Sequence, residues 1–136
     1  MAARLVPLAS VPVFEDDRGR LTLVDLDQVP FVAERAYVLN AIPKGKTRGG
    51  HASRTQARAL VCVSGQGRVT LDDGHATEAV ELDVGAMVHV PASVWHEIEA
   101  LDEELSILVL AEGGFDPADY AERSELPLTA SQTRDA

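Results

Sequence analysis

A histidine lies near the centre of a strongly basic stretch in an otherwise acidic chain. The stretch from Arg35 to Leu71 contains no Asp or Glu, although the 136-residue chain has a formal net charge of −10. It holds seven of the twelve basic side chains, namely Arg35, Lys44, Lys46, Arg48, Arg54, Arg58 and Arg68. His51 lies among them in the hexapeptide Arg48-Gly49-Gly50-His51-Ala52-Ser53, and imidazole titrates near neutral pH. This pattern predicts a site for a small anion with an acid/base group beside it.

The elements that must position these residues are short strands. Alternating or β-branched runs predict strands at 20–27, 33–42, 57–64, 67–72, 75–82, 87–90, 95–100 and 105–110. Ser64-Gly65-Gln66-Gly67 and Asp73-Gly74 are turn signals, and no segment of the body has a helical period. We therefore predict an all-β antiparallel sandwich or jelly roll, with the glycines, Gly49 and Gly50 included, in its tight turns.

The C-terminal part differs from the body of the chain. Asp116 and Pro117 suit the N-cap and first position of a short helical segment. The last eight residues are small and polar, so we predict one domain over 1–128 and a disordered tail over 129–136.

Composition limits the classes of partner. The net negative charge argues against broad binding to nucleic acid or to anionic membranes. The chain has one cysteine, Cys62, and we see no signal segment or apolar run long enough to span a membrane. We expect a cytoplasmic protein with a small anionic ligand.

Two blocks of the chain resemble the two motifs of the cupin superfamily. They are Gly49-Gly50-His51-Ala52-Ser53 and the run from Gly85 to His96. The cupin motifs commonly hold a metal, but here Ser53 and Ala57 stand where a second His and a Glu would be. His51 and His96 alone fall short of the three protein ligands of a typical catalytic zinc site, so we expect no metal and no cofactor.

A narrower resemblance covers about a hundred residues. Pieces with family-like order and spacing are 17–21, 29–31, 35–37, 48–52, 63–65, 71–74, 94–97 and 115–120. Together they resemble the WxcM-like cupins that act as dTDP-sugar 3,4-ketoisomerases. This implies a cupin-type jelly roll, or double-stranded β-helix, that moves the ketone of a dTDP-4-keto-6-deoxyhexose from C4 to C3 through an enediol without a metal. It also implies a homodimer whose N-terminal strands can be exchanged.

The reaction needs a group that removes a proton from one carbon and delivers a proton to the next. We assign this role to His51. The family motif has a second histidine where this chain has Ser53, and a serine alone is no base at neutral pH. His51 therefore acts alone, another group such as Tyr37 or His96 shares the transfers, or only binding persists.

The substrate-binding candidates are arginines and aromatic residues. Arg48 and Arg58 are expected to grip the pyrophosphate, with Arg35 in the same basic window. Trp95 or Tyr37 could stack on the sugar or the base. By resemblance, Arg18 and His96 line the sugar pocket.

Strand alternation restricts how these residues can be arranged. Arg35 and Tyr37 share a face of their strand, whereas Trp95 and His96 point to opposite faces unless a bulge intervenes. Two other hypotheses remain: a sugar-nucleotide-binding cupin without this activity, motivated by Ser53, and a sugar-nucleotide epimerase.

Overall fold

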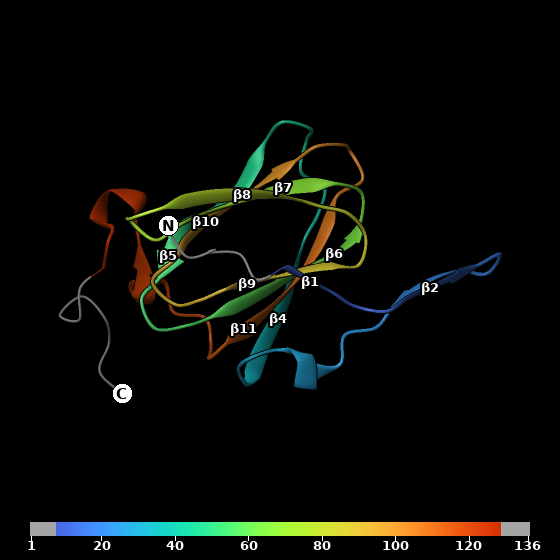
Figure 1. Cartoon of the computed structure of the whole chain (residues 1–136), viewed down its shortest axis with the longest axis horizontal. Coiled ribbons are helices and arrows are strands. Elements are labelled where there is room, and N and C mark those ends of the chain that lie inside the picture. Colours follow the sequence, from blue (N-terminus) through green and yellow to red (C-terminus); the bar gives the residue numbers. More distant parts are fainter. Residues whose placement is uncertain (1–7, 129–136) are drawn as a thin grey trace.

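Short strands make up most of the regular structure in residues 8–128, which this computed structural model describes (Figure 1). The strands are β1 (Leu8–Ser10), β2 (Val13–Asp16), β3 (Gly19–Thr22), β4 (Ala33–Leu39), β5 (Thr47–Ser53), β6 (Arg58–Ser64), β7 (Gly67–Asp72), β8 (Thr77–Leu82), β9 (Ala86–Val90), β10 (Trp95–Ala100), β11 (Ser106–Glu112) and β12 (Tyr120–Ala121). Three single-turn 3₁₀ helices accompany them: η1 (Leu26–Gln28), η2 (Pro117–Asp119) and η3 (Arg123–Glu125).

Two five-stranded sheets enclose the core. Their strand orders are β1-β9-β6-β11-β4 and β12-β5-β10-β7-β8, and every pairing is antiparallel. Buried aliphatic side chains from both sheets meet between them, among them Leu60, Leu71, Ile98 and Ile107. The prediction of an all-β jelly roll with a short C-terminal helical segment is confirmed.

Six of the eight predicted strands agree with the structure to within two residues: β6, β7, β8, β9, β10 and β11. The predicted strand 33–42 ends earlier, at Leu39, because Ala41 adopts a left-handed conformation with φ 55°. The predicted strand 20–27 is largely wrong, since β3 ends at Thr22 and η1 follows.

The main error of the sequence prediction is β5. Gly49 and Gly50 were expected in a tight turn, but both lie inside this strand with φ values of 92° and 80°. Their positive φ and missing side chains remove the alternating pattern by which a strand is recognised.

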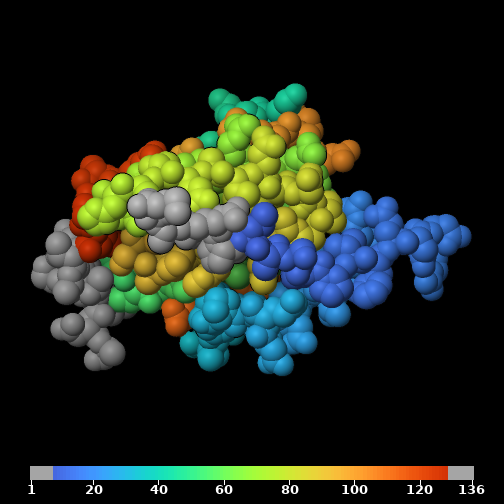
Figure 2. Space-filling model, in the orientation of Figure 1, coloured from blue at the N-terminus to red at the C-terminus, as the bar shows by residue number. Residues whose placement is uncertain are grey.

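The hairpin of β2 and β3 projects from the two sheets as an arm. Figures 1 and 2 show this arm extending away from the body of the molecule. Phe14 and Leu21, which pair across it, are 59% and 57% exposed. The predicted disordered tail, 129–136, lies outside the described residues. Within 8–128 no helix is long and apolar enough to cross a membrane.

Candidate active site

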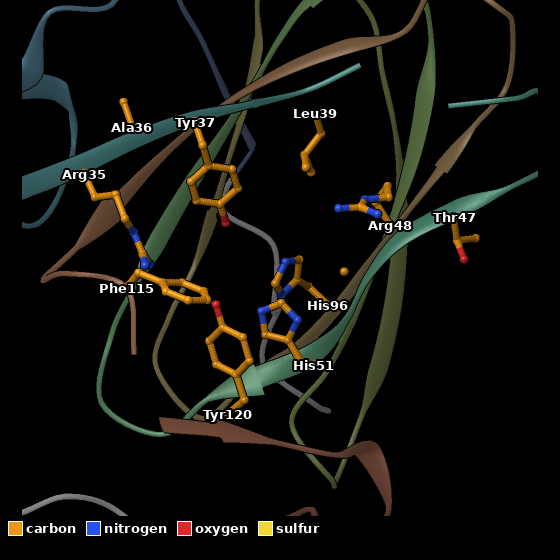
Figure 3. A pocket seen from close by; sticks show the side chains of 11 residues that line it. Arg35, Ala36, Tyr37, Leu39, Thr47, Arg48, His51, His96, Phe115 and Tyr120 are labelled. Atoms are coloured by element: carbon orange, nitrogen blue, oxygen red, sulfur yellow. The ribbon is translucent and has the colours of Figure 1, made fainter. Parts of the chain in front are cut away.

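A pocket of about 570 Å³ opens between strands of the two sheets (Figure 3). Strands β4, β5 and β10 and the segment 115–120 contribute its wall. The lining residues are Arg35, Ala36, Tyr37, Leu39, Thr47, Arg48, Gly49, His51, His96, Phe115 and Tyr120. Five residues predicted as catalytic or substrate-binding are therefore together here: Arg35, Tyr37, Arg48, His51 and His96.

Strand β4 contributes a basic and aromatic part of the wall. Its exposure alternates residue by residue, and Arg35, Tyr37 and Leu39 all line the pocket, as the shared-face prediction requires for the first two. The Arg35 guanidinium carbon lies 5.7 Å from the Tyr37 ring centroid and 5.8 Å from that of Phe115. Gln56 accepts a hydrogen bond from Arg35 Nη2 at 3.3 Å. These contacts hold the guanidinium at the pocket wall.

Strand β5 brings His51 against β10. His51 pairs with His96, and the register shifts between His96 and Glu97. Gly49 makes this close approach possible, because a Cβ atom there would lie 3.1 Å from the His96 carbonyl oxygen and 3.4 Å from its Nε2. The two imidazole centroids are 5.1 Å apart with the rings at 72°.

Both imidazoles favour their neutral form. Burial, followed by the positive charge of Arg58, lowers the pKa of His51, and a hydrogen bond to the Gly49 backbone opposes this effect. His51 Nε2 is buried and has no hydrogen-bond partner among the described residues. Burial lowers the pKa of His96 to about 3. A neutral His51 with a free ring nitrogen can accept a proton.

The C-terminal segment supplies the part of the wall that lies against His51. Tyr120 stacks on His51, with centroids 4.1 Å apart and planes at 17°. Backbone pairing of Tyr120 with Ser53 fixes this contact. Asp119 is buried and accepts hydrogen bonds from the Thr55 backbone N–H and hydroxyl, at 3.2 and 2.9 Å. The predicted N-cap also forms, with the Asp116 side chain accepting from the Ala118 N–H.

Arg58 does not line the pocket but lies behind its wall. Its side chain is buried, with a residue exposure of 1%. Its Nε donates to Tyr37 Oη at 3.1 Å and its Nη1 donates to Ser53 Oγ. Ser53 is itself buried. The residue predicted to grip a pyrophosphate therefore has its guanidinium turned toward two hydroxyls inside the protein.

Two predicted substrate-binding residues lie elsewhere in this chain. Arg18 is at the turn of the arm, with its side chain 86% exposed and paired with Asp16. Trp95 is buried on the opposite face of β10 from His96, where it packs with Ala52 and Ala121. That opposition follows the predicted alternation, so His96 and not Trp95 reaches the pocket.

Sequence reasoning missed several lining residues, including Leu39, Thr47, Phe115 and Tyr120. Leu39 continues the period-two pattern of Arg35 and Tyr37 and could have been found from it. Thr47 lies on the unrecognised strand. Phe115 and Tyr120 belong to a conspicuous segment, but its return to β5 is a long-range contact that no local pattern reports.

Figure 3 shows the aromatic side chains of β4 and of the C-terminal segment directed into the same space as the two imidazoles. Within residues 8–128, no group of three or more His, Cys, Asp or Glu side chains is arranged to hold a metal ion. The pocket thus combines cationic, aromatic and proton-accepting groups.

Comparison with known proteins finds one family model and one curated relative that match most of the chain. The family model FdtA, described as WxcM-like, C-terminal, matches residues 4–126. A TDP-4-oxo-6-deoxy-alpha-D-glucose-3,4-oxoisomerase of Aneurinibacillus thermoaerophilus is 34% identical over 107 residues, which cover 77% of each chain.

Solved structures agree in fold. A variant of the 3,4-ketoisomerase QdtA from Thermoanaerobacterium thermosaccharolyticum in complex with TDP-4-keto-6-deoxyglucose superposes with a TM-score of 0.81 at 24% identity, covering 93% of each chain. QdtA in complex with TDP gives a TM-score of 0.79 at 26% identity, covering 90% of this chain and 91% of that one.

Proposed function

The chain belongs to the FdtA family of WxcM-like C-terminal domains, and we propose on that basis that it is a sugar-nucleotide 3,4-ketoisomerase. Its reaction moves the ketone of a dTDP-4-keto-6-deoxyhexose from C4 to C3. The observation that carries this proposal is that His51 Nε2, in a pocket with arginine and aromatic side chains, has no hydrogen-bond partner within residues 8–128. The protein is therefore an isomerase whose partner is a small sugar nucleotide.

His51 is the proposed acid/base group at carbon. The neutral imidazole takes the proton from C3, beside the C4 ketone, and an enediol forms. The same imidazole then returns a proton to C4, while the oxygen at C3 becomes the ketone. A group with a lowered pKa is suited to the first transfer because it is already unprotonated at neutral pH.

Tyr37 is the proposed acid/base group at oxygen. The enediol route also requires a proton for the C4 oxygen and removal of a proton from the C3 hydroxyl, so that one proton is gained and one is lost. Tyr37 lines the same pocket as His51 and its hydroxyl is held by Arg58. The route assigns no step to a metal.

The nucleotide portion is proposed to bind through arginine and aromatic side chains. Arg48 and Arg35 line the pocket and can donate paired hydrogen bonds to pyrophosphate oxygens. Phe115 and Tyr120 offer flat apolar surfaces for the sugar or the base. His96 contributes a neutral polar group to the sugar end.

A homodimer is proposed because of the arm. In a single chain the apolar side chains of Phe14 and Leu21 are exposed to solvent. Contact with a second copy would bury them. Arg18 can contribute to a sugar pocket only if the arm reaches the pocket of that second copy, because in its own chain it lies outside the pocket.

A cytoplasmic location is also proposed. Its support is the single cysteine, Cys62, which is buried and forms no disulfide, as suits a reducing compartment. Fractionation of the cells that make the protein, followed by immunodetection, checks this location, and recovery in a membrane or extracellular fraction would contradict it.

The deciding experiment is incubation with freshly prepared dTDP-4-keto-6-deoxyglucose in deuterated water, followed by NMR spectroscopy. We expect a 3-keto product and solvent deuterium at the carbons that exchange protons. Deuterium exchange with inversion but without ketone migration would indicate an epimerase. Binding without exchange would indicate a sugar-nucleotide-binding protein. His51→Asn is the matched control and should abolish both exchange and migration.

A further inference from the structure

Arg58 is a buried cation for which residues 8–128 supply no counter-ion. No carboxylate of residues 8–128 forms an ion pair with it. Its Nη2 is buried without a hydrogen-bond partner among those residues. Its guanidinium carbon lies 5.6 Å from the ring centroid of Tyr120. An uncompensated buried charge destabilises a fold, so its presence beside a pocket calls for a functional explanation.

The contacts of Arg58 determine the direction of a neighbouring hydroxyl group. A guanidinium has donors only, so the Tyr37 oxygen must be the acceptor of the bond from Nε. The hydrogen of Tyr37 therefore points away from Arg58. Tyr37 lines the pocket from β4 (Figure 3), so a hydrogen that points away from Arg58 can be donated to a substrate oxygen there.

Ser53 holds the other side of the same guanidinium. Its buried hydroxyl accepts from Nη1 and joins Arg58 to β5, the strand that carries His51. Arg58 is the first residue of β6. Its side chain contacts β4 through Tyr37 and β5 through Ser53, and so links these two strands. One side chain keeps the two proposed proton-transfer groups in register.

We propose that Arg58 is a positioning residue of the isomerase: held by Ser53, it orients the Tyr37 hydroxyl so that Tyr37 exchanges protons with the substrate oxygens while His51 serves the carbons. This inference rests on the proposed function. Proton balance is closed: His51 moves a proton from C3 to C4, and Tyr37 gives its proton to the C4 oxygen and recovers one from the C3 hydroxyl. Arg58 stays protonated throughout.

The test is a double-mutant cycle on ketone migration, with Arg58→Met, Tyr37→Phe and the double variant. We expect Tyr37→Phe to lower kcat about 10²-fold or more and Arg58→Met about tenfold or more. If Arg58 acts through Tyr37, the double variant should stay within about threefold of Tyr37→Phe alone. Arg68→Met, at a half-buried arginine that is paired with Glu81 and Glu99 and lies outside the pocket lining, is the matched control and should retain the wild-type rate.

Binding of dTDP, measured by calorimetry, separates positioning from a phosphate contact. Because Arg58 lies behind the pocket wall, Arg58→Met should change the dissociation constant less than about threefold. A large loss of dTDP affinity with an unchanged kcat would overturn the proposal and make Arg58 a phosphate-binding residue. The proposal would also be overturned if the fold-loss of kcat in the double variant equalled the product of the fold-losses in the two single variants.

Arg58→Lys keeps the test decisive if Arg58→Met does not fold, as judged by circular dichroism. Lysine retains the charge but not the two-sided contact, so we expect an intermediate kcat and the same non-additivity with Tyr37→Phe. A wild-type protein without migration on the 4-keto sugar would refute the proposed function itself. Migration by the wild type with additive variants would refute only the role of Arg58.

Discussion

The proposed role of His51 as a base depends on its surroundings as well as on its residue type. Burial and the nearby charges of Arg58 and Arg35 disfavour the imidazolium, while the Gly49 backbone partly offsets them. The result is an imidazole that is neutral when the substrate arrives. The pKa of His51 should therefore set the pH below which the reaction slows.

The acidic limb of kcat/KM should report this pKa. Protonation removes the base, and a pKa below the ordinary 6.5 means that activity is retained at pH 6.5 and lost as the pH falls further. Arg58→Met removes one of the causes of the shift and should move the limb toward higher pH. Stopped assays across the pH range measure both profiles. A wild-type limb above pH 6.5 would contradict the assignment to His51.

Arg48 should dominate the binding of the pyrophosphate. Arg48→Gln removes a charged donor from the pocket wall and should weaken dTDP binding about 10- to 100-fold. Lys44→Gln makes the same change of charge at an exposed residue outside that wall and should alter the affinity much less. Calorimetric titration with dTDP compares the two, and equal losses would mean that only the overall charge matters.

Ser53→His tests the position at which this chain departs from the family motif. Ser53 is buried against Arg58, so an imidazole there overpacks the site and should cost about 1–3 kcal/mol of unfolding free energy. Arg58→Gln in the same chain makes room and should restore much of the loss. Thermal unfolding measures both. An unchanged stability of the single variant would show that the space behind the pocket is larger than the contacts imply.

At the scale of elements, the irregular strand β5 is what brings the two imidazoles together. Gly49→Ala would introduce a Cβ atom against the His96 backbone and also strain a φ of 92°. Gly45→Ala is the matched control, because its φ is 86° but nothing lies within 4 Å of the added atom.

Both alanine variants should lose roughly 1 kcal/mol of stability through the unfavourable φ, as seen by thermal unfolding. Gly49→Ala alone should also lose activity, about tenfold or more, because His96 and His51 are pushed apart. Equal activity of the two variants would show that the close approach of β5 and β10 is unimportant for the reaction.

The strands that could be predicted are those with a continuous local pattern. Alternating apolar residues located β6 to β11 well, and period two correctly placed Arg35 beside Tyr37. β5 could not be recognised because its two glycines have no side chains to alternate. The pairing of β12 with β5 could not be predicted because it joins residues far apart in the chain.

The basic window illustrates the same limit for the site. Its arginines read as one anion patch, but Arg54 pairs with Glu125, and Arg68 pairs with Glu81 and Glu99. These acids lie outside the window and reach it only through sheet pairing and the returning C-terminal segment. Arg35 and Arg48 line the pocket, while Arg58 is buried behind it. A window free of acids was therefore a correct guide to the pocket but a poor guide to each arginine.

At the scale of the whole molecule, the arm makes the proposed dimer testable by complementation. Arg18→Gln and His51→Asn should each inactivate the protein if the arm of one copy completes the pocket of the other. Unfolding and refolding the two variants together should restore about a quarter of the wild-type activity, because half of the dimers are mixed and each has one intact pocket. Sedimentation velocity should show the dimer throughout.

Two outcomes would contradict this arrangement. A monomeric wild-type protein in sedimentation velocity would contradict the proposed dimer. If the arm makes the dimer contact, Phe14→Asp should convert the dimer into monomers. A dimer without complementation would mean that Arg18 does not act in the pocket of the partner. Glu103→Ala, in the turn before β11, is a surface control that should leave both association and activity unchanged.

The back-to-back placement of Trp95 and His96 has an optical consequence. Trp95 is the only tryptophan of the chain, and its ring centroid lies 4.3 Å from the guanidinium carbon of Arg123 in the C-terminal segment. The fluorescence emission of the protein at long wavelength therefore comes from one fluorophore, on the strand whose other face carries His96. If occupation of the pocket moves that segment or β10, the environment of this single indole changes, and its emission would report binding in real time without an attached dye.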